Sequence, residues 1–293
     1  MSQRVQTRIR EKASTENYVH CASHCLNLVL NTSSQLPAVR NMFATMSDVI
    51  NFFNESPKRR AMLEVNLLTF CDTRFIHGHD SILRLSEHFS VVLSCLQDID
   101  EAVNMDAKTK DKSVSLLSSV SSSSFLVSLS AAKKVMSLTY TLSKYLQSPK
   151  LDMFEGTEMA CSIIEHLQIW RVDYSIWHGG DFSVFSGCEQ LAQAAGIELM
   201  KPGLTDRQQH RVSQVNADET ASDYYKRSIW FPYLVGVISH MCDKFRGAAT
   251  TAILLSSVLR SAAPGAPPIE LLAGAFTLAS TASTIGSSSG DPS

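Results

Sequence analysis

The segment YVHCASHCLNLV, residues 18–29, joins two different local patterns. Its first four residues are typical of a short strand, because tyrosine and valine favour extended backbone. After them, Leu26, Val29 and Leu30 recur at steps of three and four, which is the spacing of one face of a helix. The segment therefore predicts a strand that leads directly into a helix.

Helical spacing continues over most of the remaining chain. The clearest example is residues 36–54, where apolar side chains fall at steps of three or four. The charged residues 104–112 predict a loop, and the serine-rich residues 118–124 predict a flexible stretch or a frayed helix end. Pro232 predicts a kink or a restart within the last helix. Further helices are predicted at residues 2–13, 76–103, 128–147, 152–173, 182–196 and 219–246.

These patterns predict a mostly α protein in three parts. Residues 1–95 form a short strand-containing unit, and residues 96–261 form an all-helical domain. Residues 262–293 are dominated by alanine, serine, glycine and proline, so we expect a low-complexity, largely disordered tail.

Composition excludes several classes of protein. The 293 residues carry a net charge of −2, with 26 basic and 28 acidic side chains, which excludes a uniformly basic nucleic-acid coat and an acidic solvating tail. The seven cysteines are odd in number and form no Cys-x-x-Cys pair, so reduced thiols in the nucleus or cytoplasm are expected. No secretory signal or transmembrane run is visible, and we expect no membrane association.

Three segments in this order resemble the hAT-superfamily transposase-like proteins. They are residues 18–29, the motif CDTRF at 71–75 and the motif DYYKRSIWFPYL at 223–234. The most similar branch is the one shared by the zinc-finger MYM-type proteins and the repressor of the inhibitor of the protein kinase. The residues that match its motifs are Cys21, His24, Leu26, Asn27, Thr73 and Arg74.

The resemblance implies a partial RNase H-like α/β core fragment, followed by a large all-helical insertion domain. Active members of such folds hold two divalent metals with acidic residues, which stabilise the attacking and leaving oxygens of a phosphodiester. The family's aspartates precede the Cys-x-x-His element, but no Asp-bearing strand precedes Tyr18 here, and the surroundings of Glu270 do not match the family's glutamate. We therefore predict no catalytic residues, no metal and no cofactor.

The resulting functional prediction is a non-catalytic, transposase-derived module for nuclear protein or nucleic-acid interaction. The alternative is a fragment of an active hAT-type DNA transposase whose catalytic acids lie outside this chain. A third reading is a pseudogene-like product without a stable fold. Protein partners are expected to bind the helical domain, whereas the oligomeric state stays open.

Two groups of side chains invite a more specific reading. His20, Cys21, His24 and Cys25 could supply zinc ligands, but four ligands within six residues can rarely surround one metal tetrahedrally. Arg4, Arg8 and Lys12 form one basic stripe and are candidate phosphate contacts, as is the run at 58–60. Because residues 1–90 carry a small positive charge only, DNA binding is expected to be weak.

Overall fold

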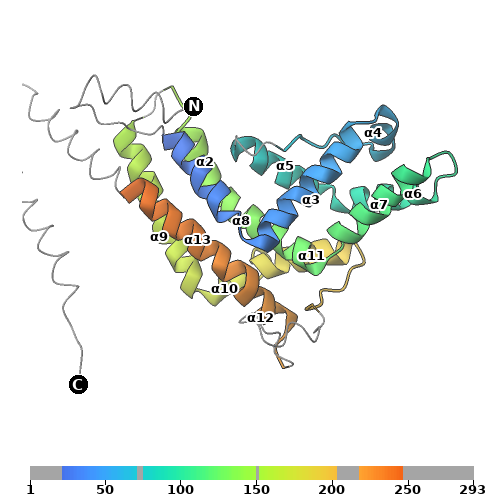
Figure 1. Ribbon diagram of the computed structural model, residues 1–293. Coiled ribbons are helices and arrows are strands. Elements are labelled where there is room, and N and C mark those ends of the chain that lie inside the picture. Colours follow the sequence, from blue (N-terminus) through green and yellow to red (C-terminus); the bar gives the residue numbers. More distant parts are fainter. Residues whose placement is uncertain (1–21, 71–74, 150–151, 203–217, 247–293) are drawn as a thin grey trace, which may run out of the picture.

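The computed structural model of the protein describes residues 22–70, 75–149, 152–202 and 218–246 (Figure 1). Within these residues every regular element is a helix, which confirms the mostly α class. The strand predicted at residues 18–21 and the tail at 262–293 lie outside this part of the chain. So do the basic stripe of Arg4, Arg8 and Lys12 and the motif residues Cys21, Thr73 and Arg74.

The predicted helix that follows the residue 18–21 segment and the predicted helix at 36–54 are confirmed, whereas the helix predicted at 2–13 lies outside the described residues. Apolar spacing did not predict the short helix that begins at Pro57 or the helix that begins at Ala107. The bounds are α2 Ala22–Ser33, α3 Pro37–Asn54, α4 Pro57–Leu63, α5 Phe75–Glu87, α6 Phe89–Glu101 and α7 Ala107–Val120.

The single helix predicted over 76–103 is wrong, because the chain breaks at His88 into α5 and α6. His88 has φ −110° and ψ 23°, outside the helical region. Leu85, Phe89 and Val92 are all buried across the break. The helical spacing of apolar residues therefore continues across the break, so the sequence pattern does not indicate it.

The predicted charged loop at 104–112 is also wrong in its second half. The Asp106 carboxylate accepts hydrogen bonds from the Thr109 amide at 3.1 Å and the Thr109 hydroxyl at 2.7 Å, so it caps the start of α7. The serine-rich segment that follows is a helix-to-helix turn. Ser122 caps α8 by accepting a hydrogen bond from the Phe125 amide at 3.3 Å.

The second half of the described chain is built around α8, the longest helix among the described residues. This helix packs against α3, α5, α9 and α11, and in Figure 1 it passes between the group of α2, α9 and α13 and the group of α3 to α7. The bounds are α8 Ser123–Tyr145, α9 Met153–Val172, α10 Tyr174–His178, α11 Val184–Ala194, α12 Ala221–Tyr225 and α13 Phe231–Met241.

Pro232 lies at the start of α13, directly after a π-helical turn at Lys226–Trp230. Proline has no amide hydrogen to donate to the preceding turn, and the wider π turn accommodates that missing bond. The predicted kink or restart is confirmed. A second π turn, Cys242–Arg246, ends the described chain.

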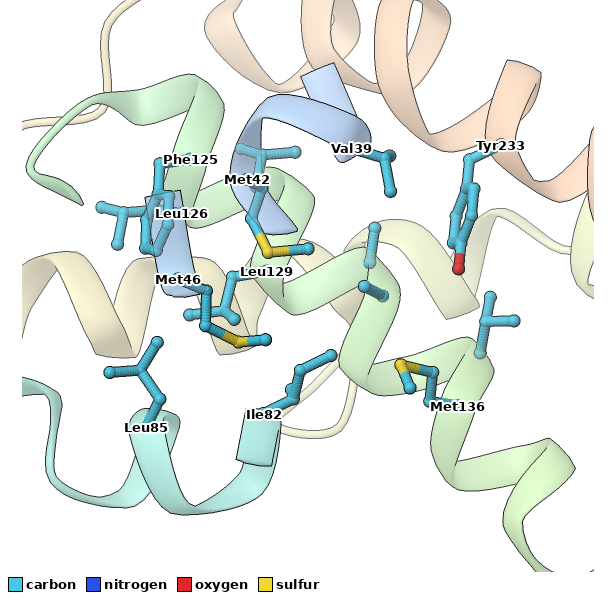
Figure 2. Packing of buried hydrophobic residues seen from close by; sticks show 14 of the residues in the cluster. Val39, Met42, Met46, Ile82, Leu85, Phe125, Leu126, Leu129, Met136 and Tyr233 are labelled. Carbon is cyan, nitrogen blue, oxygen red and sulfur yellow. The ribbon is translucent and has the colours of Figure 1, made fainter. Parts of the chain in front are cut away.

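One hydrophobic cluster extends from α2 to the final π turn. Figure 2 shows its centre, where Met42 and Met46 of α3 face Leu129 of α8, with Ile82 and Leu85 of α5 below them. The cluster contains residues from both sides of residue 95, and the domain boundary there stays a prediction. No single helix in the described part is long and apolar enough to cross a bilayer; α7 and α8 meet that test only as a pair bent by 65°.

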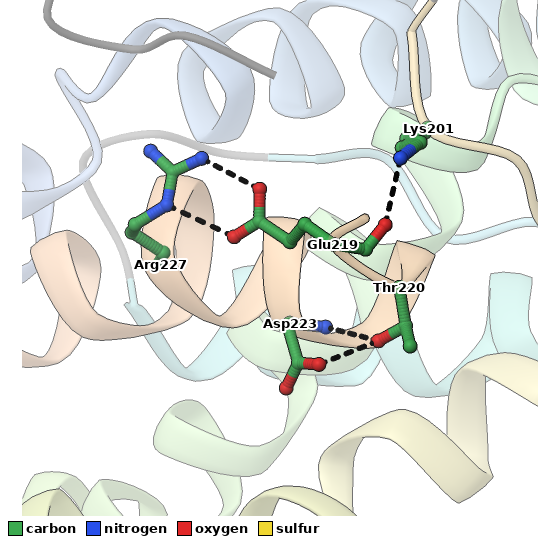
Figure 3. A network of polar contacts seen from close by, with 5 residues as sticks. All are labelled: Lys201, Glu219, Thr220, Asp223 and Arg227. Atoms are coloured by element: carbon green, nitrogen blue, oxygen red, sulfur yellow. Dashed lines mark hydrogen bonds and ion pairs between the residues drawn. The ribbon is translucent and has the colours of Figure 1, made fainter. Parts of the chain in front are cut away.

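A polar network connects the described residues on either side of 203–217 (Figure 3). The Lys201 ammonium donates to the Glu219 carbonyl at 2.7 Å. The Glu219 carboxylate accepts two hydrogen bonds from the Arg227 guanidinium, at 3.0 and 2.8 Å. Thr220 caps α12 by accepting from the Asp223 amide at 3.1 Å. These bonds fix the start of α12 against Lys201.

Candidate binding site

A cavity of about 230 Å³ lies where α2, α3, α5, α8 and α13 meet. Its walls combine amide and hydroxyl side chains with apolar ones. The lining residues are Asn27, Leu30, Asn31, Ser34, Gln35, Arg40, Phe43, Ala44, Ser47, Phe70, Gly78, Met136 and Tyr233.

One stripe of α2 and one stripe of α3 supply most of the wall. Asn27, Asn31 and Ser34 are spaced by four and three residues, so they share one face of α2 and its continuation. Arg40 and Ser47 lie on α3 at a separation of seven, again on one face. The two helices are joined by a short turn, in which the Ser34 amide donates to the Leu30 carbonyl at 3.0 Å. The turn therefore brings both polar stripes to the same opening.

Aromatic and aliphatic side chains form the floor of the cavity. Leu30, Met136 and Tyr233 are buried, and the rings of Phe43 and Phe70 stack with centroids 5.1 Å apart. Gly78 of α5 leaves little room at this point, because a Cβ atom there would lie 3.2 Å from the Phe70 ring and 3.3 Å from the Met136 methyl group. A larger residue would press on both walls.

Tyr233 provides a polar group at the base of the cavity. Its side chain is almost fully buried, and this burial raises the pKa of the Tyr233 phenol above its ordinary value, while a hydrogen bond with Ser34 acts in the opposite direction. The Ser34 hydroxyl donates its own proton to the Leu30 carbonyl at 2.7 Å. Ser34 therefore connects the Tyr233 hydroxyl of α13 to the end of α2.

The charge of the lining comes from one residue. Arg40 is exposed at the rim, and none of the ion pairs among the described residues includes its guanidinium. It lies in the first turn of α3, whose N-cap residue Leu36 makes no side-chain hydrogen bond to the helix. The partial positive charge of a helix N-terminus adds to that of the guanidinium. This end of the cavity is electropositive.

The residues predicted as family motifs have three different environments. His24 is exposed on α2, Leu26 is completely buried in the core, and Asn27 lines the cavity. The remaining motif residues, Cys21, Thr73 and Arg74, lie outside the described chain, as do the candidate phosphate contacts. Of the predicted site residues, the structure brings Asn27 to the cavity.

The sequence reading missed most of the cavity wall, including Arg40. Asn31 and Ser34 continue the stripe of Asn27 along a helix whose other face is apolar. Polar side chains at helical spacing beside a motif residue are the signal that could have indicated this stripe. The contributions of Gly78 and Met136 come from distant helices and carry no local signal.

The basic run at 58–60 makes contacts within the protein. The side chains of Lys58, Arg59 and Arg60 donate to the backbone carbonyls of Asn104, Phe52 and Asn54, respectively. The Arg59 guanidinium also lies 4.3 Å from the centre of the Phe52 ring. These cations are therefore engaged in contacts within the protein.

A buried histidine adjoins the cavity wall. His79, the neighbour of Gly78, is 5% exposed, and its ring stacks on Tyr140 of α8 with centroids 4.2 Å apart. Its Nε2 atom is 3.3 Å from the Ser137 hydroxyl. Burial lowers the pKa of His79, and the nearby Asp80 only partly opposes this effect. The ring is therefore a neutral packing group between α5 and α8.

Clustered metal ligands are not found in the described part of the chain: no group of three or more His, Cys, Asp or Glu side chains could hold an ion there. Cys25 of the Cys/His segment is buried on α2. Two of the four side chains of the zinc reading, His20 and Cys21, lie outside the described residues.

Comparison with known proteins identifies distant relatives. No protein-family model matches the chain, and no solved structure matches it. The 52 kDa repressor of the inhibitor of the protein kinase from Homo sapiens is 24% identical over 275 residues, which cover 88% of this chain and 35% of the relative. Its counterpart from Mus musculus is 24% identical over 276 residues, covering 88% and 36%. The chain spans about a third of the length of these relatives, and its similarity to each of them is distant.

Proposed function

We propose that this chain is a non-catalytic, transposase-derived helical module that binds a protein partner in the nucleus or cytoplasm. In this proposal residues 1–95 derive from an RNase H-like core and residues 96–261 from its helical insertion. The partner places one apolar side chain in the cavity between α2 and α3. The observation that carries the proposal is the chemistry of the cavity lining.

The described lining is suited to binding. It offers neutral amides and hydroxyls, one guanidinium and an apolar floor, and it includes no carboxylate, thiol or imidazole. Such groups orient a ligand by hydrogen bonds and apolar contact. They are poor candidates for general acid–base work at neutral pH, which needs a group that titrates there.

The size of the cavity favours a side chain over a cofactor. Its volume of about 230 Å³ is below the ~300 Å³ at which sites for small organic ligands begin. Binding energy at protein interfaces is concentrated in a few aromatic or aliphatic anchors that fill such pockets. The similarity to proteins described as repressors of a protein-kinase inhibitor is consistent with a partner that is itself a protein.

The test selects random peptides displayed on phage against the full chain. Two matched tryptophan variants on α3 report whether the cavity is the site. Ala44→Trp places a large ring at the cavity mouth, from an exposed lining position. Asn41→Trp places the same ring on an exposed position of α3 outside the lining. Ser47→Trp serves as a second blocking variant if Ala44→Trp fails to fold by circular dichroism.

We expect a peptide pool that binds the wild type and Asn41→Trp but not the blocking variants. A pool that is insensitive to the blocking variants, or no pool at all, would overturn the binding site. The alternative of a transposase fragment is tested separately, with labelled duplex DNA and Mg²⁺ or Mn²⁺. Strand cleavage by the purified chain would overturn the non-catalytic reading.

A further inference from the structure

We infer that the cavity selects a peptide in which an acidic residue lies next to the apolar anchor. The inference rests on the proposed function and adds the chemical class of the partner. It places the carboxylate of the peptide against Arg40, at the N-terminal end of α3, while the anchor fills the apolar floor.

The first support is a cation without a partner in the described chain. Arg40 is exposed and forms none of the ion pairs found among the described residues. The other cations close to it in sequence, at positions 58–60, all donate to backbone carbonyls. Arginine offers a planar fork of donors that matches a carboxylate with two parallel hydrogen bonds. Arg40 is therefore available to an anion that enters the cavity.

The second support is the helix end on which Arg40 lies. Leu36 cannot cap α3, because its side chain carries no acceptor, and no side-chain hydrogen bond is made to the first turn. Pro37 removes one of the unpaired amide hydrogens, and those of the next residues face no side-chain acceptor from the cap. An acidic side chain of the partner that binds Arg40 would interact favourably with the dipole of this helix.

The third support is the contrast between the rim and the floor. Gln35, in the turn between α2 and α3, and Arg40 of α3 are exposed lining residues, whereas Leu30, Met136 and Tyr233 are buried. The sole charged side chain of the described lining is thus at the edge of an apolar pocket. A peptide that satisfies both parts must carry its acid beside its anchor, within one or two residues.

The experiment repeats the phage selection on three proteins: the wild type, Arg40→Gln and Arg40→Glu. Only peptides that Ala44→Trp fails to bind are sequenced. We expect Asp or Glu next to the anchor in the wild-type pool, loss of this preference with Arg40→Gln, and Lys or Arg at that place with Arg40→Glu. A synthetic wild-type peptide should bind about tenfold more weakly when its acid is replaced by the matching amide. The same replacement should not change binding to Arg40→Gln.

The outcomes separate this inference from the proposed function. A cavity-dependent pool without an acidic preference would overturn the inference and leave the binding site in place. An acidic preference that persists in Arg40→Gln would also overturn it, because another cation would then be responsible. The absence of any cavity-dependent pool would overturn the proposed function itself.

Discussion

Removal of one buried hydroxyl tests the contact between α2 and α13 that forms the base of the cavity. Tyr233 is 1% exposed, and its hydroxyl forms a hydrogen bond with Ser34. In Tyr233→Phe, Ser34 keeps its own bond to the Leu30 carbonyl, so no polar atom loses its last partner. We expect the free energy of unfolding to fall by about 1 kcal/mol, the net value of one ordinary hydrogen bond.

Ser34→Ala should cost more, because it removes the hydrogen-bond partner of the buried Tyr233 hydroxyl. Such an unpaired group costs about 2 kcal/mol. The double variant should lose less than the sum of the two single variants, with a coupling of about 1 kcal/mol. Urea unfolding gives these values, and the midpoint of thermal unfolding should fall by about 3 °C for each kcal/mol.

Tyr174→Phe is the matched control, since Tyr174 is 48% exposed; its stability should stay within about 0.5 kcal/mol of the wild type. A Tyr233→Phe protein as stable as the wild type would show that the hydroxyl makes no useful bond. Ser34→Ala with a smaller loss than Tyr233→Phe would contradict the expected cost of leaving the Tyr233 hydroxyl without its partner.

Three further perturbations address other parts of the fold. Burial lowers the pKa of His79 below its ordinary value of 6.5. The neutral ring therefore contributes its full stability above that pH, and stability falls on acidification because the unfolded chain binds the proton first. His79→Gln should reduce the fall of the urea midpoint between about pH 7.5 and 5.5. The same change at the exposed His166 should leave this fall unchanged. Gly196 has φ +63°, so Gly196→Ala should lose about 1 kcal/mol. Gly236→Ala within α13 should increase the free energy of unfolding by about 0.5 kcal/mol, because alanine favours a helix and its Cβ would meet Ser33 at an ordinary 3.9 Å. Urea unfolding compares the two alanine variants, and equal effects on stability would contradict the backbone argument. Burial raises the pKa of the fully buried Cys188 thiol, so iodoacetamide should label Cys188 far more slowly than the half-buried Cys242 in the folded protein. Mass spectrometry measures the two labelling rates, and faster labelling of Cys188 would contradict this expectation.

The sequence pattern predicted several of the described helices from their apolar faces. The helix at 36–54 is found at Pro37–Asn54, and Pro232 was correctly predicted to disturb the last helix. The break at His88 could not be predicted, because buried residues flank it at helical spacing on both sides. Capping by Asp106 could have been recognised, since a carboxylate three residues before Thr109 is a common helix start.

The cavity was less predictable than the helices. Asn27 was singled out as a motif residue, but the motif gave no reason to expect a pocket beside it. Gly78 and Met136 reach the same place from α5 and α8 through tertiary packing alone. The role of Arg40 depends on which cations the fold has already engaged, and this information exists only after the helices have packed.

The most direct test of the account is a carbon-13 methyl spectrum of the methionine-labelled full chain, recorded with a selected peptide. The Met136 methyl group lines the cavity. Met200 is exposed, and its amide donates a hydrogen bond to the Ser123 hydroxyl at the first residue of α8. Ser123 lies about 20 Å along the helix from Met136. The account predicts that the peptide shifts the Met136 signal in a saturable way and leaves the Met200 signal in place. A bound peptide that shifts Met200, or that leaves Met136 unchanged, would contradict it.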